Sequence, residues 1–538
     1  MLSIFQQFVN NFNKPKNWLV LANVTLVFFL ITLNNLGIIP LRMGDFIFFA
    51  ILTLALALYR PGWAFLFFVG TIILENVNLA PAELGLTIRP YQFIGTLTIV
   101  AIVIRIFSGK LNFKLVKLKW LDWLIIIFAI SSFLSIINSS NKLISLKLSI
   151  ILATFIALYF LVRNYIQNLE DVKKIIPFFL SSSAVVMFYG IWQNVRFSSG
   201  LRNFETMPGR PNATFTEADW LGIFLVLFIS VIYILIYLIF NFQFSIFKQF
   251  SRLKFLITKI LLFLLLTSCF VLLILTVSRS AWLGALAMTF IFLFTVFTNL
   301  KFNPRNLSAD EAGWQWKKTI QMKLIIISAL LIAIGTVYLF HLTNFQLGNR
   351  VQSTGTGLQK ITISCEKNIN LPESINNITE LEKYDCRHIN LEEINSEKSQ
   401  GKYVAEIYRK DPNVNIRKEI YQKSWAEIKN HWVLGIGWGN ISEILGLDES
   451  GTPLNSSNIF LEVWLGNGIL GFASLIILFS YIILSAVKRY FFAKDLEEKV
   501  FGLFLIISWF GIVIPNLFNA GIFLGFLWVW IAIAQSKN

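Results

Sequence analysis

Charged residues are scarce in this chain, and their scarcity restricts its class. Of 538 residues only 14% are charged, whereas 56% are hydrophobic. A soluble domain carries about 25% charged and about 45–50% apolar residues. The composition therefore excludes soluble enzymes, coiled coils and disordered scaffolds. A mean hydropathy of +0.66 is that of a polytopic membrane protein.

Cysteine and histidine are also rare, with three residues of each. Cys269 lies in an apolar run, whereas Cys365 and Cys386 lie in the one sizeable polar region. Two thiols outside the cytosol can pair as a disulfide, with two free thiols as the alternative. A zinc site is not expected, because His388 is the only imidazole nearby and zinc takes four ligands. We expect no cofactor and no bound metal.

Long apolar runs dominate the rest of the sequence. A hydrocarbon core about 30 Å thick needs roughly 20 apolar residues per helix. The runs predict helices near 18–33, 44–59, 63–76, 88–107, 120–137, 145–162, 175–194, 219–240, 255–277, 281–298, 322–341, 461–484, 500–517 and 520–535. The second, third and last are short, so the sequence predicts an all-α integral membrane protein, a polytopic bundle of about 12–14 transmembrane helices.

Basic residues predict the orientation of the bundle. Cytoplasmic connections retain Lys and Arg, and alternate connections here are rich in them, as in 105–119, 248–259 and 301–323. Both termini are therefore predicted to be cytoplasmic. Because the basic charge is explained by topology, we expect membrane lipids as neighbours and no nucleic acid as a partner.

This topology divides the chain into three parts. Residues 1–341 are predicted to form the N-terminal transmembrane helices and residues 458–538 the C-terminal ones. Residues 342–457 form one large extracytoplasmic (periplasmic) loop, the main polar region of the chain. Within it, apolar residues at helical spacing over 413–432 predict an amphipathic helix that returns to the membrane. Glycines at 435–439 predict a turn.

Three polar segments lie on the predicted outward face, where a lipid-embedded chain should avoid them. They are residues 210–222, 276–283 and 455–462. An arginine at a helix end is usually an interfacial anchor. Arg279 is harder to explain in this way, because it lies in an almost loopless corner beside Ser278, where backbone groups must find partners in protein or water.

The arginines of the first two polar segments suggest what this face binds. A guanidinium group stays charged at any relevant pH and offers five N–H donors in a fork that suits phosphate oxygens. Arg210 and Arg279, placed on one face, predict a clamp for a diphosphate. The outward face has no compact Asp-x-Asp pair, which agrees with a clamp that uses arginine in place of a metal ion.

These segments, in their order along the chain, resemble the O-antigen ligase/polymerase family of bacterial envelope proteins. The resemblance is carried by RPNATFT-x-x-x-W-L-G from Arg210, T-x-S-R-x-x-W-L from Thr276, and Arg417 followed by Trp425 and the 431–439 stretch. It implies an inverting, metal-independent glycosyltransferase in the bacterial inner membrane. Such an enzyme moves a glycan from a polyprenyl-diphosphate carrier to an acceptor hydroxyl, on a glycan or a lipid, at the periplasmic face.

The resemblance also implies roles for single residues. Arg210 and Arg279 would bind the donor diphosphate, and the other substrate-binding candidates are Ser278, Arg417 and Asn458. Ligases of the family have a His-Asn pair entering the span after the loop, the His being the expected base. This chain has Ser457 before the Asn, so a polymerase is favoured over a ligase.

The general base remains open between three catalytic candidates. Glu462 lies one helical turn beyond Asn458 and shares its face. Glu217, close to Asp219, follows Arg210, and partial burial would bring a carboxyl pKa towards a useful range. His431 is the best-placed imidazole by sequence position.

Two other functions fit the composition. The first is a solute transporter, for inorganic carbon, because carriers commonly have a similar number of spans. Transporters, however, place ionisable groups near the midplane and have paired interrupted helices, whereas the polar residues here cluster at one interface. The second is a non-catalytic scaffold whose outward loop docks other envelope components.

Overall fold

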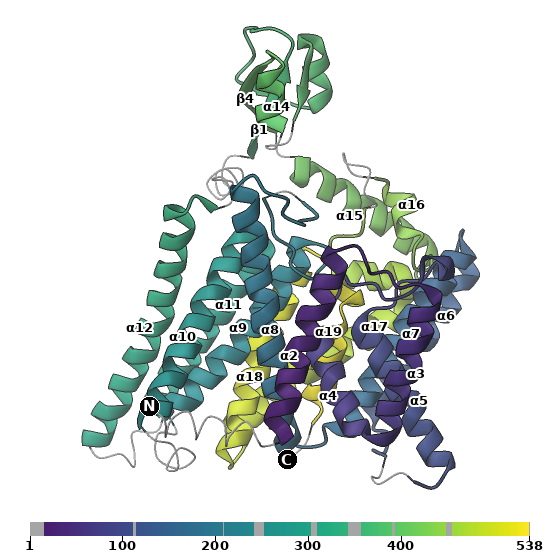
Figure 1. The fold of residues 1–538 in the computed structure, drawn as a ribbon, viewed down its shortest axis with the longest axis vertical. Coiled ribbons are helices and arrows are strands. Elements are labelled where there is room, and N and C mark those ends of the chain that lie inside the picture. Colours follow the sequence, from purple (N-terminus) through teal and green to yellow (C-terminus); the bar gives the residue numbers. More distant parts are fainter. Residues whose placement is uncertain are drawn as a thin grey trace.

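The computed structural model describes residues 15–110, 115–207, 209–241, 252–302, 309–342, 357–389, 393–410, 412–447 and 454–536. A bundle of long helices carries a small β-sheet at one end (Figure 1). The helices of the N-terminal part are α2 (Pro15–Asn35), α3 (Met43–Tyr59), α4 (Pro61–Thr71), α5 (Pro90–Phe107), α6 (Trp120–Leu134), α7 (Lys142–Tyr165), α8 (Leu169–Ser198), α9 (Ala218–Asn241), α10 (Arg252–Leu275), α11 (Arg279–Phe302) and α12 (Ala309–Leu339). Short 3-10 turns are η1 (Ala82–Leu84) and η2 (Ser135–Asn138).

The rest of the chain supplies the sheet, the helices beside it and the last helices of the bundle. The polar region contains β1 (Leu358–Cys365), β2 (Ser374–Ile375), η5 (Ile378–Tyr384), β3 (Cys386–His388), α14 (Glu393–Ser399), β4 (Tyr403–Lys410), α15 (Pro412–His431) and α16 (Ile441–Leu445). The bundle is then completed by α17 (Ile459–Phe492), α18 (Leu496–Asn516), η6 (Gly521–Phe523) and α19 (Gly525–Ala534).

Eleven helices of the described ranges are long and apolar enough to cross a membrane. Three further apolar helices are shorter, and they are the three that the sequence predicts to be short: α3, α4 and α19. The 11 residues of α4 and the 10 of α19 rise only about 15 Å at about 1.5 Å per residue. The predicted spans at 63–76 and 520–535 are therefore half-length helices continued by non-helical backbone, which corrects the upper end of the expected span count.

The backbone beside these half-helices forms no α-helix. It comprises the 72–80 segment after α4, which is mostly buried, and the 517–524 segment before α19, which is partly exposed over 517–519, mostly buried over 520–524, and contains η6. Backbone N–H and C=O groups away from water need protein partners. Partners of both segments include residues of the polar motifs, as described below.

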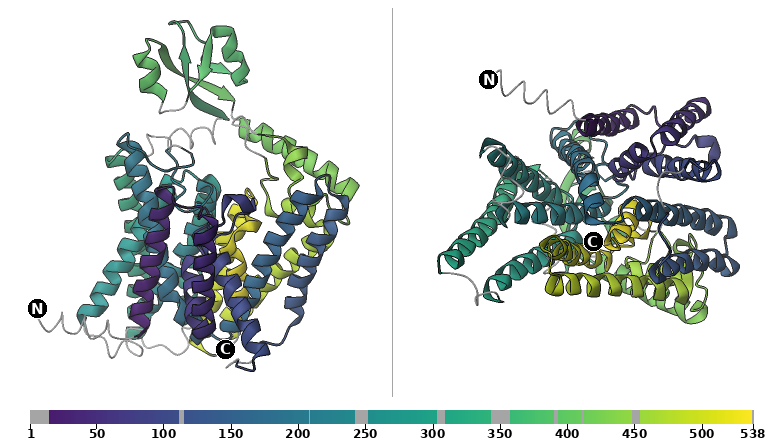
Figure 2. Two further views of the ribbon diagram at one scale, coloured as in Figure 1. Left: turned by 45° about the vertical axis from the view of Figure 1, so that its right-hand side comes forward. Right: turned by 90° about the horizontal axis from the view of Figure 1, so that it is seen from below.

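The three polar segments and the sheet lie at the same end of the bundle. In Figures 1 and 2 the connections α8–α9 and α10–α11 and the start of α17 lie at the end that carries the sheet. Helix α15 lies across this end, whereas α2 begins at the opposite end. The polar motifs, far apart in the sequence, thus share one face of the molecule.

The sheet forms a small folded unit inside the polar region. Its strand order is β2-β4-β1-β3, with β1 antiparallel to β3 and β4, and β2 parallel to β4. The predicted disulfide is confirmed, since Cys365 and Cys386 are bonded and face each other across β1 and β3. The Ser364 hydroxyl and the Arg387 guanidinium hold the pKa of Glu397 below its ordinary 4.5, which ties α14 to the sheet.

Removal of this disulfide is expected to loosen the sheet alone. The bond joins residues 21 apart, and closing a loop of this size stabilises a fold by roughly 3 kcal/mol. The double variant Cys365→Ser, Cys386→Ser should therefore show faster amide hydrogen exchange in β1 and β4. Cys269→Ala is the matched control, because Cys269 is a free buried thiol in α10. Unchanged exchange in the double variant would contradict the prediction.

The predicted amphipathic helix is α15. Ile420 and Ile428 are buried on one side of it, whereas Trp425 is 48% exposed and packs edge-on against Trp464 of α17. The chain then turns at 435–439, as predicted, and the glycines at 435, 437 and 439 all have positive φ.

This turn packs against a break in α17. Gly468 has φ 65° and ψ −166° inside that helix. A Cβ atom on Gly468 would lie 2.1 Å from the carbonyl oxygen of Val433, and one on Gly435 would lie 2.3 Å from that of Leu465. The Ile436 N–H donates to the same Leu465 carbonyl at 2.7 Å. Two backbones are in direct contact here because neither glycine has a side chain.

Candidate functional site

The site begins with a turn that fixes Arg210 ahead of helix α9. The Arg210 N–H donates to the Met207 carbonyl at 3.0 Å. Asn212 closes the next turn, with its amide nitrogen donating to the Phe215 carbonyl and its amide oxygen accepting the Thr206 N–H. The turn residues are therefore held by their own side chains, which explains why a short polar stretch keeps one conformation among apolar helices.

The Arg210 guanidinium connects the first polar motif to the second. Its Nε donates to the Thr276 carbonyl at 3.0 Å, and its Nη2 pairs with the Asp219 carboxylate at 3.0 Å. Its Nη1 faces the Met207 sulfur at 3.7 Å, and a thioether is a weak acceptor. The Arg210 side chain is 14% exposed. The guanidinium therefore lies close to the protein surface, and its Nη1 group has a weak hydrogen-bond partner.

The corner between α10 and α11 consists of residues 276–278. Val277 has a left-handed φ of 52°, which turns the chain through the corner and directs the Thr276 carbonyl towards Arg210. Thr276 and Ser278 are fully buried. A Cβ atom on Gly222 of α9 would lie 2.7 Å from that of Ala281, so α9 packs tightly on this corner. Arg279 follows at the first residue of α11, half-buried.

The third polar motif, residues 455–462, contacts the residues that follow α18. Asn458 donates from its amide nitrogen to the Leu517 carbonyl at 3.2 Å. Arg417, near the start of α15, places its guanidinium 5.6 Å from the ring centre of Phe518. We call residues 517–519 the junction segment, because it contacts the third motif and α15 together.

The junction segment also contacts the second motif. Asn519 donates from its amide nitrogen to the Ser280 hydroxyl at 2.9 Å, and the Ser280 and Ser278 hydroxyls lie 3.3 Å apart. A continuous set of contacts thus runs from Arg210 through the α10–α11 corner to the junction segment. The structure therefore brings Arg210, Ser278, Arg417 and Asn458 into one cluster, with Arg279 at its corner.

Asn458 and Glu462 both have structural contacts of their own. The Asn458 amide oxygen caps α17 by accepting the N–H groups of Phe460 and Leu461. The Glu462 carboxylate accepts the Ser456 N–H at 2.8 Å and is buried. Both side chains therefore hold the tight entry into α17, where Ser457 has a left-handed φ of 49°.

The three candidate bases lie in different surroundings. Glu217 is half-buried just before α9, two residues from the Asp219 that pairs with Arg210. His431 lies fourteen residues from Arg417 on α15, or about 21 Å along the helix at about 1.5 Å per residue. It is 41% exposed, 3.9 Å from Glu427 of its own helix. The structure does not bring His431 to the cluster.

Sequence reasoning missed the junction segment. Its only signal is a pair of asparagines, Asn516 and Asn519, in an otherwise apolar stretch. It also missed Thr214, whose hydroxyl donates to the Ile73 carbonyl at 2.6 Å and whose carbonyl accepts the Asn76 N–H at 2.7 Å. The 72–80 segment therefore supports the turn that follows Arg210.

A separate apolar cavity of about 220 Å³ lies between α4, α8, α9, α18 and α19. Its charged lining residues are Lys173 and Glu497, which pair with each other at 2.7 Å. Such a lining suits hydrocarbon and offers nothing for a diphosphate, so this cavity is not the candidate site. Within the described ranges, no group of three or more His, Cys, Asp or Glu side chains is placed to hold a metal ion.

Comparison with known protein families gives a match for part of the chain. Residues 260–476 match the family described as O-antigen ligase, which confirms the resemblance given by the motifs. The match contains the α10–α11 corner, Arg417 and the entry into α17, whereas Arg210 and the junction segment lie outside it. No curated protein and no solved structure matches. The alternative of a solute transporter gains no support.

Proposed function

We propose that this multi-pass membrane protein transfers a glycan from a polyprenyl-diphosphate carrier to an acceptor hydroxyl, and the match of residues 260–476 to the O-antigen ligase family supports this. The acceptor oxygen attacks the anomeric carbon of the carried glycan. The bond from that carbon to the diphosphate breaks, and the diphosphate leaves with the electron pair. Attack opposite the leaving group inverts the anomeric centre.

The observation that carries this proposal is the hydrogen bond from the Arg210 guanidinium to the Thr276 carbonyl. It joins an arginine outside the matched family region to the corner that holds Arg279 inside it. Two cationic side chains, one from the turn before α9 and one from the first residue of α11, thereby lie at one end of the bundle. A diphosphate gathers negative charge as it departs, and fixed donors stabilise that charge most where water is excluded.

Arg210 is placed to bind phosphate oxygens without refolding. Its Nε and Nη2 are held by Thr276 and Asp219, and among the described residues its Nη1 donates to the Met207 sulfur. A phosphate oxygen is a far stronger acceptor than a thioether. Arg417 lies over the Phe518 ring, and its guanidinium offers N–H donors that suit a second anionic group.

The acceptor hydroxyl must lose its proton, and we assign this role to Glu217. Glu217 lies two residues from Asp219, which pairs with Arg210, whereas His431 lies on a distant part of α15. Glu217 is half-buried beside the clamp. A partly desolvated carboxylate is a stronger base than a solvated one.

We infer that the sheet end of the bundle is the periplasmic face of an inner membrane. The Cys365–Cys386 disulfide lies in the sheet, and structural disulfides persist outside the reducing cytosol. The arrangement suits a lipid-linked donor, because its tail can stay in the bilayer while its diphosphate reaches the polar cluster. We favour a polymerase, since Ser457 cannot act as the base that the ligases place there.

The direct test is transfer by the purified protein in detergent. It would receive a polyprenyl-diphosphate-linked oligosaccharide as both donor and acceptor. We expect release of polyprenyl diphosphate, longer lipid-linked glycans, and the same rate in excess EDTA, because the clamp uses guanidinium groups. Glu217→Gln should reduce transfer by about 100-fold, the usual size of a general-base effect. No release of polyprenyl diphosphate with this donor would reject the proposal.

A further inference from the structure

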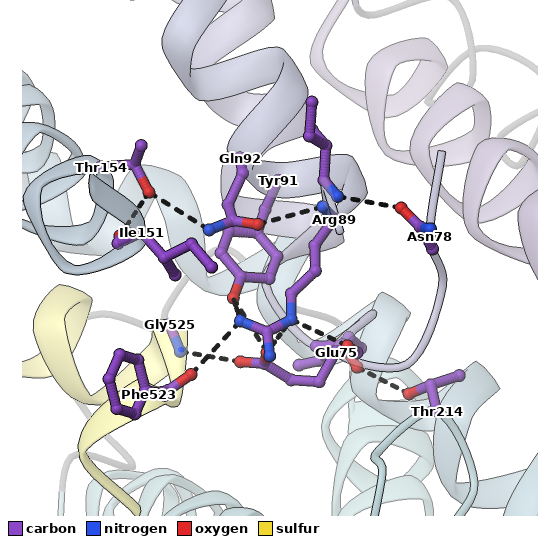
Figure 3. Close-up of polar contacts among 12 residues, drawn as sticks. Glu75, Asn78, Arg89, Tyr91, Gln92, Ile151, Thr154, Thr214, Phe523 and Gly525 are labelled. Carbon is purple, nitrogen blue, oxygen red and sulfur yellow. Dashed lines mark hydrogen bonds and ion pairs between the residues drawn. The ribbon is translucent and has the colours of Figure 1, made fainter. Parts of the chain in front are cut away.

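A buried carboxylate lies outside every helix, at the centre of the 72–80 segment. Glu75 is 1% exposed, and each of its carboxylate oxygens has a donor (Figure 3). Oε1 accepts the Gly525 N–H at 2.7 Å, and Oε2 accepts the Tyr91 hydroxyl at 2.9 Å. The Nε of Arg89 lies 3.0 Å from Oε2 and donates to the Glu75 carbonyl at 2.9 Å.

The ion pair between Glu75 and Arg89 is retained although burial makes it costly. Taking two charges out of water is compensated only where geometry is good and the remaining donors are satisfied. Here the Arg89 Nη1 donates to the Phe523 carbonyl at 3.3 Å and to the Tyr91 hydroxyl at 3.2 Å. The pair therefore binds backbone groups of η6 and of the start of α19, more than 400 residues further along the chain.

The Glu75 side chain acts as the N-terminal cap of α19. Leu524 occupies the N-cap position and has no side-chain cap hydrogen bond. The first N–H groups of a helix have no partner within it, and they favour a negative charge. The Glu75 carboxylate supplies both the acceptor and the charge. The contact is close because Gly525 has no side chain, and a Cβ atom there would lie 2.6 Å from the Tyr91 ring.

The same segment supports both sides of the polar cluster. On one side, Ile73 and Asn76 hold Thr214, in the turn after Arg210. On the other side, Glu75 holds Gly525, at the end of the connection that contains the junction segment. The 72–80 segment thus lies between the Arg210 turn and the residues that contact Arg417, Asn458 and Ser280.

We propose that Glu75 is a positioning residue for glycan transfer. Through its own bond to Gly525, and through Arg89, which donates to the Phe523 carbonyl, it fixes the 517–524 connection at a set distance from the Arg210 turn. The arginine clamp is thereby aligned with the rest of the cluster. Glu75 itself touches no substrate. This inference rests on the proposed function, because the rate that it affects is that of transfer.

The test compares variants of the full-length protein in detergent. In Glu75→Gln the pair with Arg89 is lost, so kcat should fall by about 10- to 100-fold, as expected for displaced reacting groups, while the donor KM changes by less than about twofold. Glu75→Asp keeps the charge and should recover part of kcat. Glu83→Gln is the matched control, because Glu83 is an exposed carboxylate in η1 of the same connection, and it should match the wild type.

Amide hydrogen exchange separates positioning from a general loss of structure. Glu75→Gln should exchange faster at 209–216 and 517–527 and at the wild-type rate in the β-sheet. If Glu75→Gln does not fold, the double variant Glu75→Gln, Arg89→Gln removes both charges, and it should restore folding without restoring kcat. Wild-type kcat in either folded variant would overturn the inference, as would unchanged exchange at both segments.

These two measurements also separate this inference from the proposed function. If the wild-type protein transfers no glycan, the proposed function fails, while the exchange comparison still tests whether Glu75 holds the two segments. If the wild type transfers glycan and Glu75→Gln does so equally well, only the positioning role fails.

Discussion

Replacement of Arg210 by alanine is expected to lower glycan transfer by about 100- to 1,000-fold, the usual cost of removing one charge-stabilising donor from an active site. The Arg210 guanidinium joins two polar motifs, and its Nη1 side is the part of the fork available to an anion. The loss should fall on kcat, because the diphosphate is most charged as the glycosidic bond breaks. Arg279→Ala should have a similar effect. Polyprenyl diphosphate release by the purified variants is the measurement.

Two further variants make this prediction specific. Arg210→Lys keeps the charge but loses the guanidinium group that donates to Thr276 and Asp219 at the same time. Its transfer rate should therefore be only slightly higher than that of Arg210→Ala. Arg202→Ala is the matched control, because Arg202 is an exposed arginine of the same connection that stacks on Phe204. It should transfer at the wild-type rate. Equal losses in Arg202→Ala and Arg210→Ala would argue for a general charge effect and against a clamp.

The second large effect is expected at Gly468, and it concerns folding. In Gly468→Ala the new Cβ atom would meet the Val433 carbonyl oxygen at 2.1 Å. Val433 lies in the turn just after α15, and a backbone oxygen cannot rotate away as a side chain can. The clash can be removed only if the turn moves away from α17. The Ile436 N–H bond to Leu465 would break as well. We expect the variant to fail to accumulate as a folded, monodisperse protein, measured by size-exclusion chromatography in mild detergent.

Gly446 offers a matched control for this substitution. Its backbone, at φ 92° and ψ −162°, occupies nearly the same glycine-only region as Gly468, but a Cβ atom there would meet nothing within 4 Å. Gly446→Ala therefore carries only the conformational strain, on the order of 1–3 kcal/mol. If it fails to fold as completely as Gly468→Ala, backbone strain and not the clash is the cause.

The sequence predicts most of the bundle, and its failures have one cause. Apolar runs mark where hydrocarbon-compatible residues lie, so all the long helices appear near their predicted positions. Hydropathy, however, cannot distinguish a helix from buried extended backbone. The 72–80 and 517–524 segments are apolar enough to resemble spans, although the chain there is held by hydrogen bonds from residues far away in the sequence. The sheet could not be predicted from the sequence either, because its strands pair with partners that lie far away along the chain.

The polar cluster was predicted in part. Charge counting placed three motifs on one face, and chemistry selected Arg210 and Arg279. The contact that joins them is a backbone carbonyl, at Thr276, and any residue type could provide it. The junction segment likewise contributes the Leu517 carbonyl and the Phe518 ring, which carry no distinctive sequence signal. Glu75 could be recognised as unusual in an apolar stretch, but its partner Gly525 could not.

The hydrogen bond between the Gly525 N–H and the Glu75 carboxylate also constrains the order in which the bundle assembles during synthesis. The two residues are 450 positions apart, which at about 5–20 residues per second means that roughly 20–90 s pass between their emergence from the ribosome. During this interval the carboxyl group has no α19 to cap. Until α19 is available, the Glu75 carboxylate has Arg89 and Tyr91 as its nearby partners in the sequence. The polar end of the bundle can therefore be completed only after α19 has been synthesised.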